Sequence, residues 1–359
     1  MKTKVPTLLF LLASVTAVVI VLLADSTRRP AISQSRERRV NSNSSETQTN
    51  DNANRTPGQR DEVVKVDVDL VTVDALVLQK NTARIVGGLK KEDFLLFEDG
   101  AQQDITHFSQ DTLPLSVLFL IDRGGCLDPF GEKVHRAAIE AVSRLKPTDE
   151  VAVMTYHDTT RLLQGFTRNR SLIEDAFNRM PTHDEEADHC LNKLFFDAAD
   201  YMVSASNPEG RRVIVVITGV TRNFDCQGGP SGKLAAQQVY ESGSVVCGII
   251  PKEVGQGVEN GVMIWATRMG RIGGAPYMDI ETLANETGGE ILADKPDNLD
   301  TTFQTLMDHL RSRYNLAYVS SNKKRDGTTR KLKLDLSQPV QKSQGKLVVK
   351  SRRSYVAPR

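Results

Sequence analysis

The sequence predicts a doubly wound α/β domain with a mainly parallel sheet, flanked by a small β-rich module. Two observations carry this prediction. Short apolar segments alternate with amphipathic helical patterns between residues 113 and 313, and strands that are apolar on both faces are typical of parallel sheets covered by helices. Segments with period-two alternation precede and follow this region, and such alternation is typical of half-buried strands.

Composition excludes several classes of protein. The chain has 359 residues, which at about 150 residues per domain favours two domains. Its 46 basic and 45 acidic side chains leave a net charge of +1, whereas a dedicated nucleic-acid-binding domain is usually strongly basic. The 25 glycines and 14 prolines are too few for a collagen-like or low-complexity chain. We therefore expect a globular protein without a nucleic-acid partner.

An apolar segment at residues 8–24 follows Lys2 and Lys4. At 1.5 Å per residue it spans roughly 25 Å, close to the ~30 Å hydrocarbon core of a bilayer. The segment is long for a cleaved signal and ends in a poor match to the small-x-small cleavage pattern. We interpret residues 1–25 as a signal anchor, with a cleaved signal peptide as the alternative. Arginines between residues 28 and 39 leave the orientation open, because the positive-inside rule would keep the remaining chain in the cytoplasm.

Residues 26–62 are rich in Ser, Thr, Asn, Gln and Arg and contain few branched apolar or aromatic side chains. Such a segment cannot bury enough apolar surface to offset the entropy lost on ordering. We expect it to be a disordered tether between the apolar segment and the folded part of the chain.

Residues 63–112 form the N-terminal part of the predicted β module. Strand patterns occur at 64–78, 94–97 and 105–108, with Asp99-Gly100 as a hairpin turn. The alternation changes phase near residue 70, which suggests a bulge or a break. About fifty residues are too few to be stable alone. Residues 314–359, which alternate again, are therefore expected to complete the module as C-terminal strands.

The region 113–313 holds the α/β pattern. Its apolar strand segments are 115–121, 151–156, 213–217 and 245–250. Helical periodicity follows these segments, at 133–145, 171–180, 191–205, 233–242, 280–286 and 299–313. This order of elements places helices on both faces of the sheet.

Several short motifs resemble the VWFA-related domain family of acidobacterial type. They are Phe94-x-x-Phe97-Glu98-Asp99-Gly100-x-Gln102, Leu283-Ala284-x-x-Thr287-Gly288-Gly289, Tyr314-x-Leu316-x-Tyr318, Arg330-Lys331-Leu332 and Arg352-Arg353-x-Tyr355-x-Ala357-Pro358. The similarity runs from about Val66 to Pro358. It implies a von Willebrand factor A-like, Rossmann-like domain that is usually exported, binds partners and has no catalytic machinery.

The resemblance also implies a metal-ion-dependent adhesion site at the carboxyl edge of the sheet. The family pattern is Asp-x-Ser-x-Ser, a later Thr and a later Asp; here Asp122 is followed by Gly124 and Cys126, and Gly219 replaces the second Asp. Lys193, counted back from Asp197, stands in place of the Thr. Mg²⁺ prefers hard oxygen ligands, so we expect a degenerate site without Mg²⁺ or Mn²⁺ and list Asp122, Gly124, Cys126, Lys193 and Gly219 as the expected partner-binding residues.

Two alternatives for this edge stay open. Lys193 either pairs with Asp122 and substitutes for the metal, or points to solvent while Asp122 caps the strand. A divalent metal would instead need a rearranged set of ligands, namely Asp122, Thr218, Thr221 and Asp225.

The four cysteines are Cys126, Cys190, Cys226 and Cys247. Cys247 lies in an apolar strand and is expected to be a buried small hydrophobe. The other three fall in loops at one edge of the sheet, and an exported protein can link two of them. The sequence does not reveal which pair. His189 together with Cys190 and Cys126 also offers ligands for adventitious zinc.

The remaining candidate features are loops. The acidic and imidazole-rich segment 183–190 is expected to be a solvated loop. Trp265 and Met269 lie in a long Gly-bounded segment, which is a second candidate for a partner-contacting loop.

We predict a non-enzymatic protein-interaction or adhesion domain with an unknown protein ligand at the cell envelope. The chain would be exported and held at the cytoplasmic membrane by its N-terminal segment, or be periplasmic or secreted. The less favoured alternative is an enzyme that uses Cys126 or His189.

Overall fold

The computed structural model describes residues 70–110, 113–180, 189–207, 210–224, 226, 228–252 and 277–359. The expected signal anchor and tether lie outside these residues. Within them, no helix combines the length and the apolar character needed to cross a membrane.

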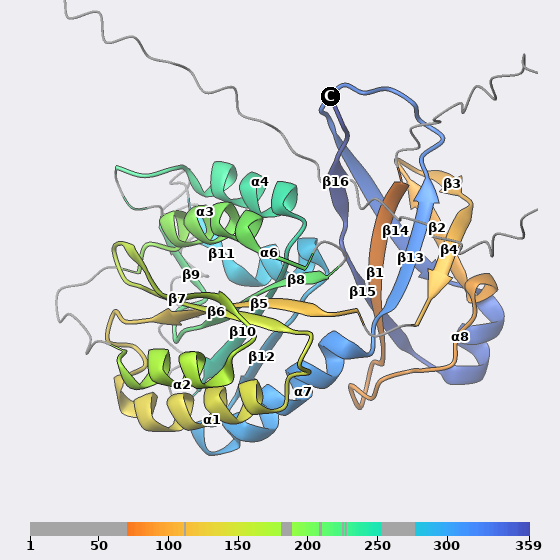
Figure 1. Ribbon diagram of the computed structural model, residues 1–359. Coiled ribbons are helices and arrows are strands. Elements are labelled where there is room, and N and C mark those ends of the chain that lie inside the picture. The colour runs from red at the N-terminus through yellow and green to blue at the C-terminus, as the bar shows by residue number, and fades with distance from the viewer. Residues whose placement is uncertain are drawn as a thin grey trace, which may run out of the picture. The chain divides into compact units, whose positions relative to one another are not determined.

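The larger sheet of the described residues has the strand order β12-β10-β8-β5-β6-β7 (Figure 1). Its strands are β5 (Leu115–Asp122), β6 (Glu150–Tyr156), β7 (Thr160–Thr167), β8 (Arg211–Ile217), β10 (Val245–Pro251) and β12 (Ile291–Asp294). All neighbours pair in parallel except β6 and β7. The predicted mainly parallel sheet is confirmed, with two edge strands, β7 and β12, that the apolar pattern did not indicate.

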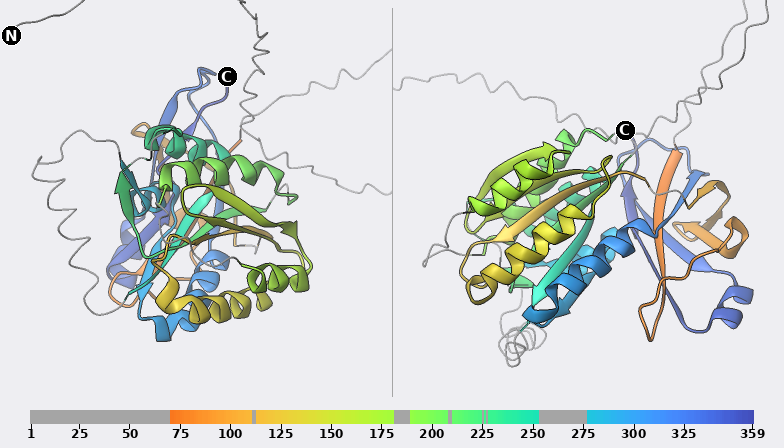
Figure 2. Two further views of the ribbon diagram at one scale, coloured as in Figure 1. Left: turned by 90° about the vertical axis from the view of Figure 1, so that its left-hand side faces the viewer. Right: turned by 60° about the horizontal axis from the view of Figure 1, so that its bottom comes forward.

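Helices cover both faces of this sheet (Figures 1 and 2). In β5, Val117, Phe119 and Ile121 point to a core shared with one set of helices, whereas Leu118 and Leu120 point to a second core. The first set is α1 (Gly131–Ser143), α2 (Arg170–Asn178) and α7 (Leu299–Arg311); the second is α3 (Leu191–Tyr201), α4 (Gly232–Ser242) and α6 (Ile280–Thr287). Strands buried on both faces explain why the sequence shows continuous apolar runs.

The β module consists of two antiparallel four-stranded sheets with the orders β15-β1-β13-β4 and β16-β14-β2-β3 among the described residues. The N-terminal strands are β1 (Leu70–Gln79), β2 (Phe94–Glu98), β3 (Ala101–Gln103) and β4 (Ile105–Ser109). The C-terminal strands are β13 (Tyr314–Val319), β14 (Thr329–Leu336), β15 (Leu347–Ser351) and β16 (Ser354–Val356), and α8 (Gln338–Gln344) lies between β14 and β15. N- and C-terminal strands pair with one another in both sheets, so the α/β domain is an insertion between two halves of the module. The bulge expected near residue 70 is absent from Leu70–Gln79, because β1 keeps an unbroken register with β13 and β15.

A buried polar cluster joins several of the sequence motifs inside the β module. Glu98 is 2% exposed and accepts hydrogen bonds from Tyr318 (2.6 Å), Tyr355 (3.1 Å) and Arg330 (3.1 Å). Ser320 donates a further bond of 2.8 Å. Burial alone would raise the pKa of Glu98, but these hydrogen bonds outweigh it and hold the pKa below its usual value. The motif residues separated along the chain therefore share one charged hydrogen-bond network.

The Thr287-Gly288-Gly289 motif ends α6 and contacts both parts of the fold. The Thr287 hydroxyl accepts from the backbone N–H of Val246 at 3.0 Å and donates to the carbonyl of Leu283 at 2.9 Å. Gly288 has φ +79° and lies against the backbone of Ser351 and Arg352 in the β module, where an added Cβ would approach to 2.5 Å. Any side chain at position 288 would strain the local backbone conformation and would also clash with the backbone of the β module.

We expect Gly288→Ala to destabilise the protein more than Gly243→Ala does. Both glycines end a helix in the left-handed conformation, with φ +79° and +67°, but a Cβ at Gly243 meets nothing within 4 Å. The control therefore carries only the left-handed strain of ~1–2 kcal/mol. Overpacking against Ser351 should add about 1–3 kcal/mol in the free energy of unfolding, measured by urea denaturation. Equal losses in the two variants would contradict the close approach of α6 to the β module.

Contacts with the β module lie at the amino edge of the larger sheet. Arg211, the first residue of β8, is 1% exposed and donates to Asp74 of β1 at 3.0 Å and to Asn315 of β13 at 2.8 Å. Its third bond, 2.6 Å, goes to the carbonyl of Leu310 at the end of α7. The carboxyl edge of the parallel strands is therefore at the opposite end of the domain from this junction.

Candidate functional site

The carboxyl edge contains a topological switch point between β5 and β8. These two strands are neighbours, but α1, which follows β5, packs on one face of the sheet and α4, which follows β8, packs on the other. Loops that leave adjacent strands toward opposite faces form the crevice in which doubly wound folds bind ligands. Asp122 ends β5 and Thr218 directly follows β8, so both lie at this point.

Asp122 is fully buried and is the centre of a hydrogen-bond network, here called the Asp122 cluster, that includes Cys126, Tyr156, His189 and Thr218. Thr218 donates to its carboxylate at 2.5 Å and Tyr156 at 3.1 Å, while Nδ1 of His189 lies 3.0 Å from both carboxylate oxygens. The backbone N–H of Gly124 adds a bond of 2.9 Å. Burial alone would raise the pKa of Asp122. The hydrogen bond and the charge of His189, with smaller contributions from the hydrogen bonds of Thr218 and Gly124, together outweigh burial and hold the pKa below its usual value.

Cys126 lies in the turn before α1 and contacts two other parts of the Asp122 cluster. Its thiol donates to Asp122 Oδ2 at 3.1 Å and accepts from the backbone N–H of Gly219 at 3.2 Å. Burial, followed by the charge of Asp122, raises the pKa of the Cys126 thiol far above its usual value. Since the thiolate is the nucleophilic form of cysteine, this thiol is poorly suited to covalent catalysis.

Two glycines make room for side chains of the Asp122 cluster. The imidazole of His189 lies over Gly124, where an added Cβ would approach its Cε1 atom to 2.6 Å. Cys126 lies over Gly219, where a Cβ would approach its own Cβ to 3.1 Å. A serine at position 124 would therefore exclude His189 from its observed place, and the two positions depend on each other.

A disulfide between Cys190 and Cys226 fastens the segment that carries His189. The two Cα atoms are 5.4 Å apart, and the bridge spans 36 positions in sequence. Asn192 reinforces it, because its side chain accepts from the backbone N–H of Cys226 at 3.1 Å and donates to the carbonyl of Pro230 at 2.8 Å. The sequence left open whether two of the three loop cysteines are linked and which two; the structure links Cys190 with Cys226. Cys126 and Cys247 are free, and Cys247 is buried as predicted.

Comparison with known protein families finds one match within the larger domain. Residues 117–221 match the family model of the von Willebrand factor type A domain. The larger domain is therefore similar to a von Willebrand factor type A domain over these residues, and we call it the A domain. No curated protein matches the chain.

Solved structures similar to the chain include bacterial proteins. An aerotolerance-related membrane protein from Bacteroides fragilis has 16% identity and a TM-score of 0.39, over 55% of this chain and 98% of the other. The conserved hypothetical protein BatB from Bacteroides thetaiotaomicron has 16% identity and a TM-score of 0.37, over 55% of this chain and 100% of the other. The minor pilin PilB from Streptococcus sanguinis has 10% identity and a TM-score of 0.39, over 57% of this chain and 63% of the other.

The predicted pairing of Lys193 with Asp122 is wrong. Among the described residues, the ion-pair partner of Asp122 is His189. Lys193 lies in the first turn of α3, and its side-chain carbons lie against Gly229, where an added Cβ would approach Lys193 Cγ to 2.7 Å. Counting back from Asp197 gave a residue inside α3, whereas the ion-pair partner of Asp122 comes from the segment that precedes this helix. Sequence reasoning missed His189 and Tyr156 as partners of Asp122, and Gly124 was the signal that a larger side chain fills the space.

The other predicted residues separate into three groups. Asp122, Gly124, Cys126 and Gly219 come together in the A domain as described above, and so does Thr218. Thr221 serves the fold through its backbone carbonyl, which accepts from the N–H of Ile280 at 2.9 Å. Asp225, Trp265, Met269 and residues 183–188 lie outside the described residues.

The donor atoms of the Asp122 cluster do not suit Mg²⁺, the ion of the family's adhesion site. Mg²⁺ requires an octahedron of hard oxygen ligands. Asp122 and Thr218 offer oxygen atoms, but Cys126 offers a sulfur and His189 a nitrogen at the same centre.

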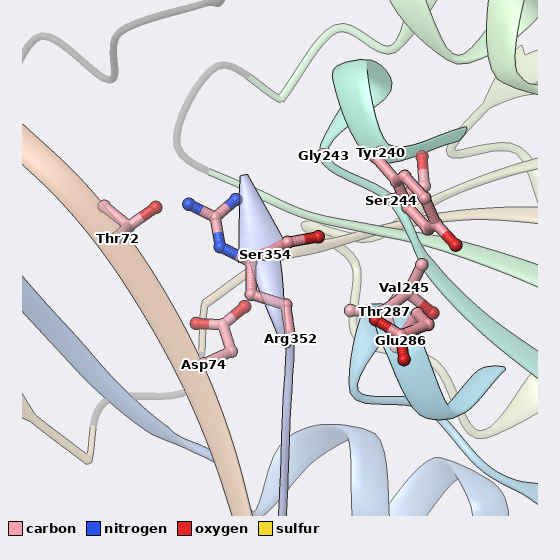
Figure 3. A pocket seen from close by; sticks show the side chains of 10 residues that line it. All are labelled: Thr72, Asp74, Tyr240, Gly243, Ser244, Val245, Glu286, Thr287, Arg352 and Ser354. Carbon is pink, nitrogen blue, oxygen red and sulfur yellow. The ribbon is translucent and has the colours of Figure 1, made fainter. Parts of the chain in front are cut away.

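A small cavity lies away from this edge, next to Tyr240 of α4, Glu286 of α6, Asp74 of β1 and Arg352 (Figure 3). Its volume of about 50 Å³ is enough for a few water molecules but not for a typical organic ligand. We therefore assign it no ligand.

We expect Cys126 to resist alkylation in the folded protein at neutral pH. Its side chain is largely buried and its pKa is raised by burial and by Asp122, so the thiolate population that alkylating reagents need is very small. Iodoacetamide labelling followed by mass spectrometry measures this, with the urea-unfolded chain as the control that both free thiols label. Rapid labelling of Cys126 in the folded protein would contradict this expectation and would support the alternative that the protein is an enzyme that uses Cys126.

Proposed function

We propose that the chain is a non-enzymatic protein-interaction module of the adhesion type, whose A domain binds a protein ligand without Mg²⁺. The observation that carries the proposal is the set of donors in the Asp122 cluster. His189 lies 3.0 Å from the carboxylate and Cys126 lies beside it, so a nitrogen and a sulfur stand where Mg²⁺ would need oxygen ligands. The imidazole thus replaces the cation of the family's adhesion site, and Cys126 and Gly219 replace two of its oxygen ligands.

The position of the cluster supports partner binding. The β module contacts the amino edge of the sheet through Arg211 and Asp74, which leaves the carboxyl edge at the other end of the domain. Asp128 and Pro129 are exposed there beside the cluster. Ligand recognition at this edge follows the general rule for doubly wound sheets.

The apolar segment at 8–24 supports export. We infer that the A domain acts at the cell envelope, held at the cytoplasmic membrane by the N-terminal segment or released from it. A near-zero net charge gives no support for a nucleic-acid partner.

A site-specific cross-linking experiment tests the proposal. A photoreactive amino acid replaces exposed Pro129 at the carboxyl edge or, as the matched control, exposed Lys342 in α8 of the β module. The full chain is mixed with the envelope fraction of its source in metal-depleted buffer, with or without added Mg²⁺. We expect one protein to be captured from position 129 and not from 342, equally well in both buffers. Capture that requires Mg²⁺ would support a rearranged metal-dependent site instead, and equal capture from both positions would contradict the proposed surface.

A further inference from the structure

We propose that Asp122, Cys126 and His189 form a binding site for a transition-metal ion of the Zn²⁺ class. One carboxylate oxygen, one sulfur and one imidazole nitrogen, from the end of β5, the turn before α1 and the segment before α3, all lie within 4.8 Å of one another. Oxygen, sulfur and nitrogen donors of these three kinds are the ligands of Zn²⁺ in proteins. The set differs from the one considered from sequence, because Cys190 is in the disulfide and Asp122 takes its place.

Two of the three donor separations are slightly shorter than those around a tetrahedral zinc ion. Asp122 lies 3.0 Å from Nδ1 of His189 and 3.1 Å from Sγ of Cys126. Tetrahedral Zn²⁺, with bonds of about 2.0–2.3 Å, separates its donors by roughly 3.3–3.6 Å. The third separation, between the His189 nitrogen and Cys126 Sγ, is at most 4.8 Å. Rotation of these side chains would bring the three donors around one ion, with the thiol proton released to the buffer.

Hydrogen bonds from neighbouring groups hold the proposed metal ligands in place. Tyr156 and Thr218 donate to the Asp122 carboxylate, and the N–H of Gly219 donates to Cys126 Sγ at 3.2 Å. Such partners orient metal ligands and are part of the affinity of protein metal sites. A carboxylate, a thiolate and a neutral imidazole together carry a charge of about −2, which matches a divalent ion.

Three protein ligands leave a fourth tetrahedral position for water or for a group of a partner. His189 is 22% exposed at its side chain, so the cluster is reached from the carboxyl edge. The inference uses the same edge as the proposed function but needs no partner, and the two are tested separately.

Cobalt substitution provides the test on the full chain, metal-depleted and with the disulfide kept oxidised. We expect one Co²⁺ to bind per chain with a thiolate-to-cobalt charge-transfer absorption band. One equivalent of Zn²⁺ should displace it, and excess Mg²⁺ should not. Cys126→Ser should abolish the band, and His189→Ala should weaken Zn²⁺ binding at least about tenfold.

Matched controls are His107→Ala and Cys247→Ala, which alter an exposed imidazole in β4 and a buried thiol in β10. Both should retain the band and the Zn²⁺ affinity of the parent, and circular dichroism verifies folding of all four variants. Absence of the band from the folded parent, or equal losses in His107→Ala and His189→Ala, would overturn the site. Either result leaves capture from position 129 intact, whereas a failed capture beside intact Zn²⁺ binding would overturn the proposed function alone.

Discussion

Glu98→Gln should lower the free energy of unfolding by about 3–5 kcal/mol, because it leaves the guanidinium of Arg330 as an uncompensated buried charge. Arg330 is 2% exposed and lies 3.1 Å from Glu98. The remaining acceptors of this guanidinium are neutral, among them the carbonyl of Asn322 at 2.6 Å, and do not balance its charge. Urea denaturation at pH 7 measures the effect.

The matched control is Lys333→Gln on the same strand, β14. Its ion pair with Asp335 is 2.7 Å long, but the two side chains are 71% and 41% exposed. Exposed pairs contribute little, so the loss should stay below about 1 kcal/mol. Similar losses in the two variants would show that the buried cluster does not stabilise the β module.

The effect of Glu98→Gln should also depend on pH. The folded-state pKa of Glu98 lies below its ordinary value of 4.5, so its stabilising contribution is present above that value and is lost as the pH falls through the folded-state pKa. The difference between parent and variant should therefore shrink in acid. A difference that grows below pH 4.5 would contradict the direction of the shift.

Replacing both Cys190 and Cys226 by alanine should lower the free energy of unfolding by about 4 kcal/mol. The bridge closes a loop with a sequence separation of 36, and the chain-entropy model assigns about this value to a loop of that length. The main effect lies in the unfolded state, which gains conformations when the link is removed. The measurement is urea denaturation of parent and variant under oxidising conditions.

Reductant provides the internal control for this second prediction. It should bring the parent down to the stability of the double variant and leave the variant unchanged, because the variant has no bridge to lose. A parent whose unfolding midpoint does not respond to reductant, with the bridge shown to be open by mass spectrometry, would contradict the assigned role.

The sequence predicted the interior of the A domain well and its edges poorly. Strands such as β5 and β8 are buried on both faces, and their continuous apolar runs made them easy to recognise. The edge strand β7 is half exposed and mixes polar with apolar residues, so it follows neither period. The β module was predictable from alternation, but the meeting of Glu98, Tyr318, Arg330 and Tyr355 in one network was not, because periodicity does not define which strands become neighbours.

The candidate site was predicted in part for a similar reason. The shared location of Asp122, Cys126 and Gly219 could be predicted, because these residues lie at or just after the ends of strands that the sequence pattern shows clearly. The place of His189 depends on the missing Cβ of Gly124, 65 positions away in sequence, and such a steric dependence emerges only when both loops are in place. Gly124 was visible in the sequence, whereas the side chain that packs over it was not.

The insertion of the A domain between β4 and β13 has a mechanical consequence. Both strands are neighbours in one sheet, and β13 also pairs with β1, the strand through which the chain enters the described fold. If the carboxyl edge of the A domain were pulled while the segment before β1 was held, the force would pass through the β4–β13 and β13–β1 pairings. The first half of β1 pairs with β13 and the second half pairs with β15. Tension along β1 would therefore act on the backbone hydrogen bonds on both sides of the strand. Under such a load, the β module would transmit force between the carboxyl edge and the segment that precedes β1.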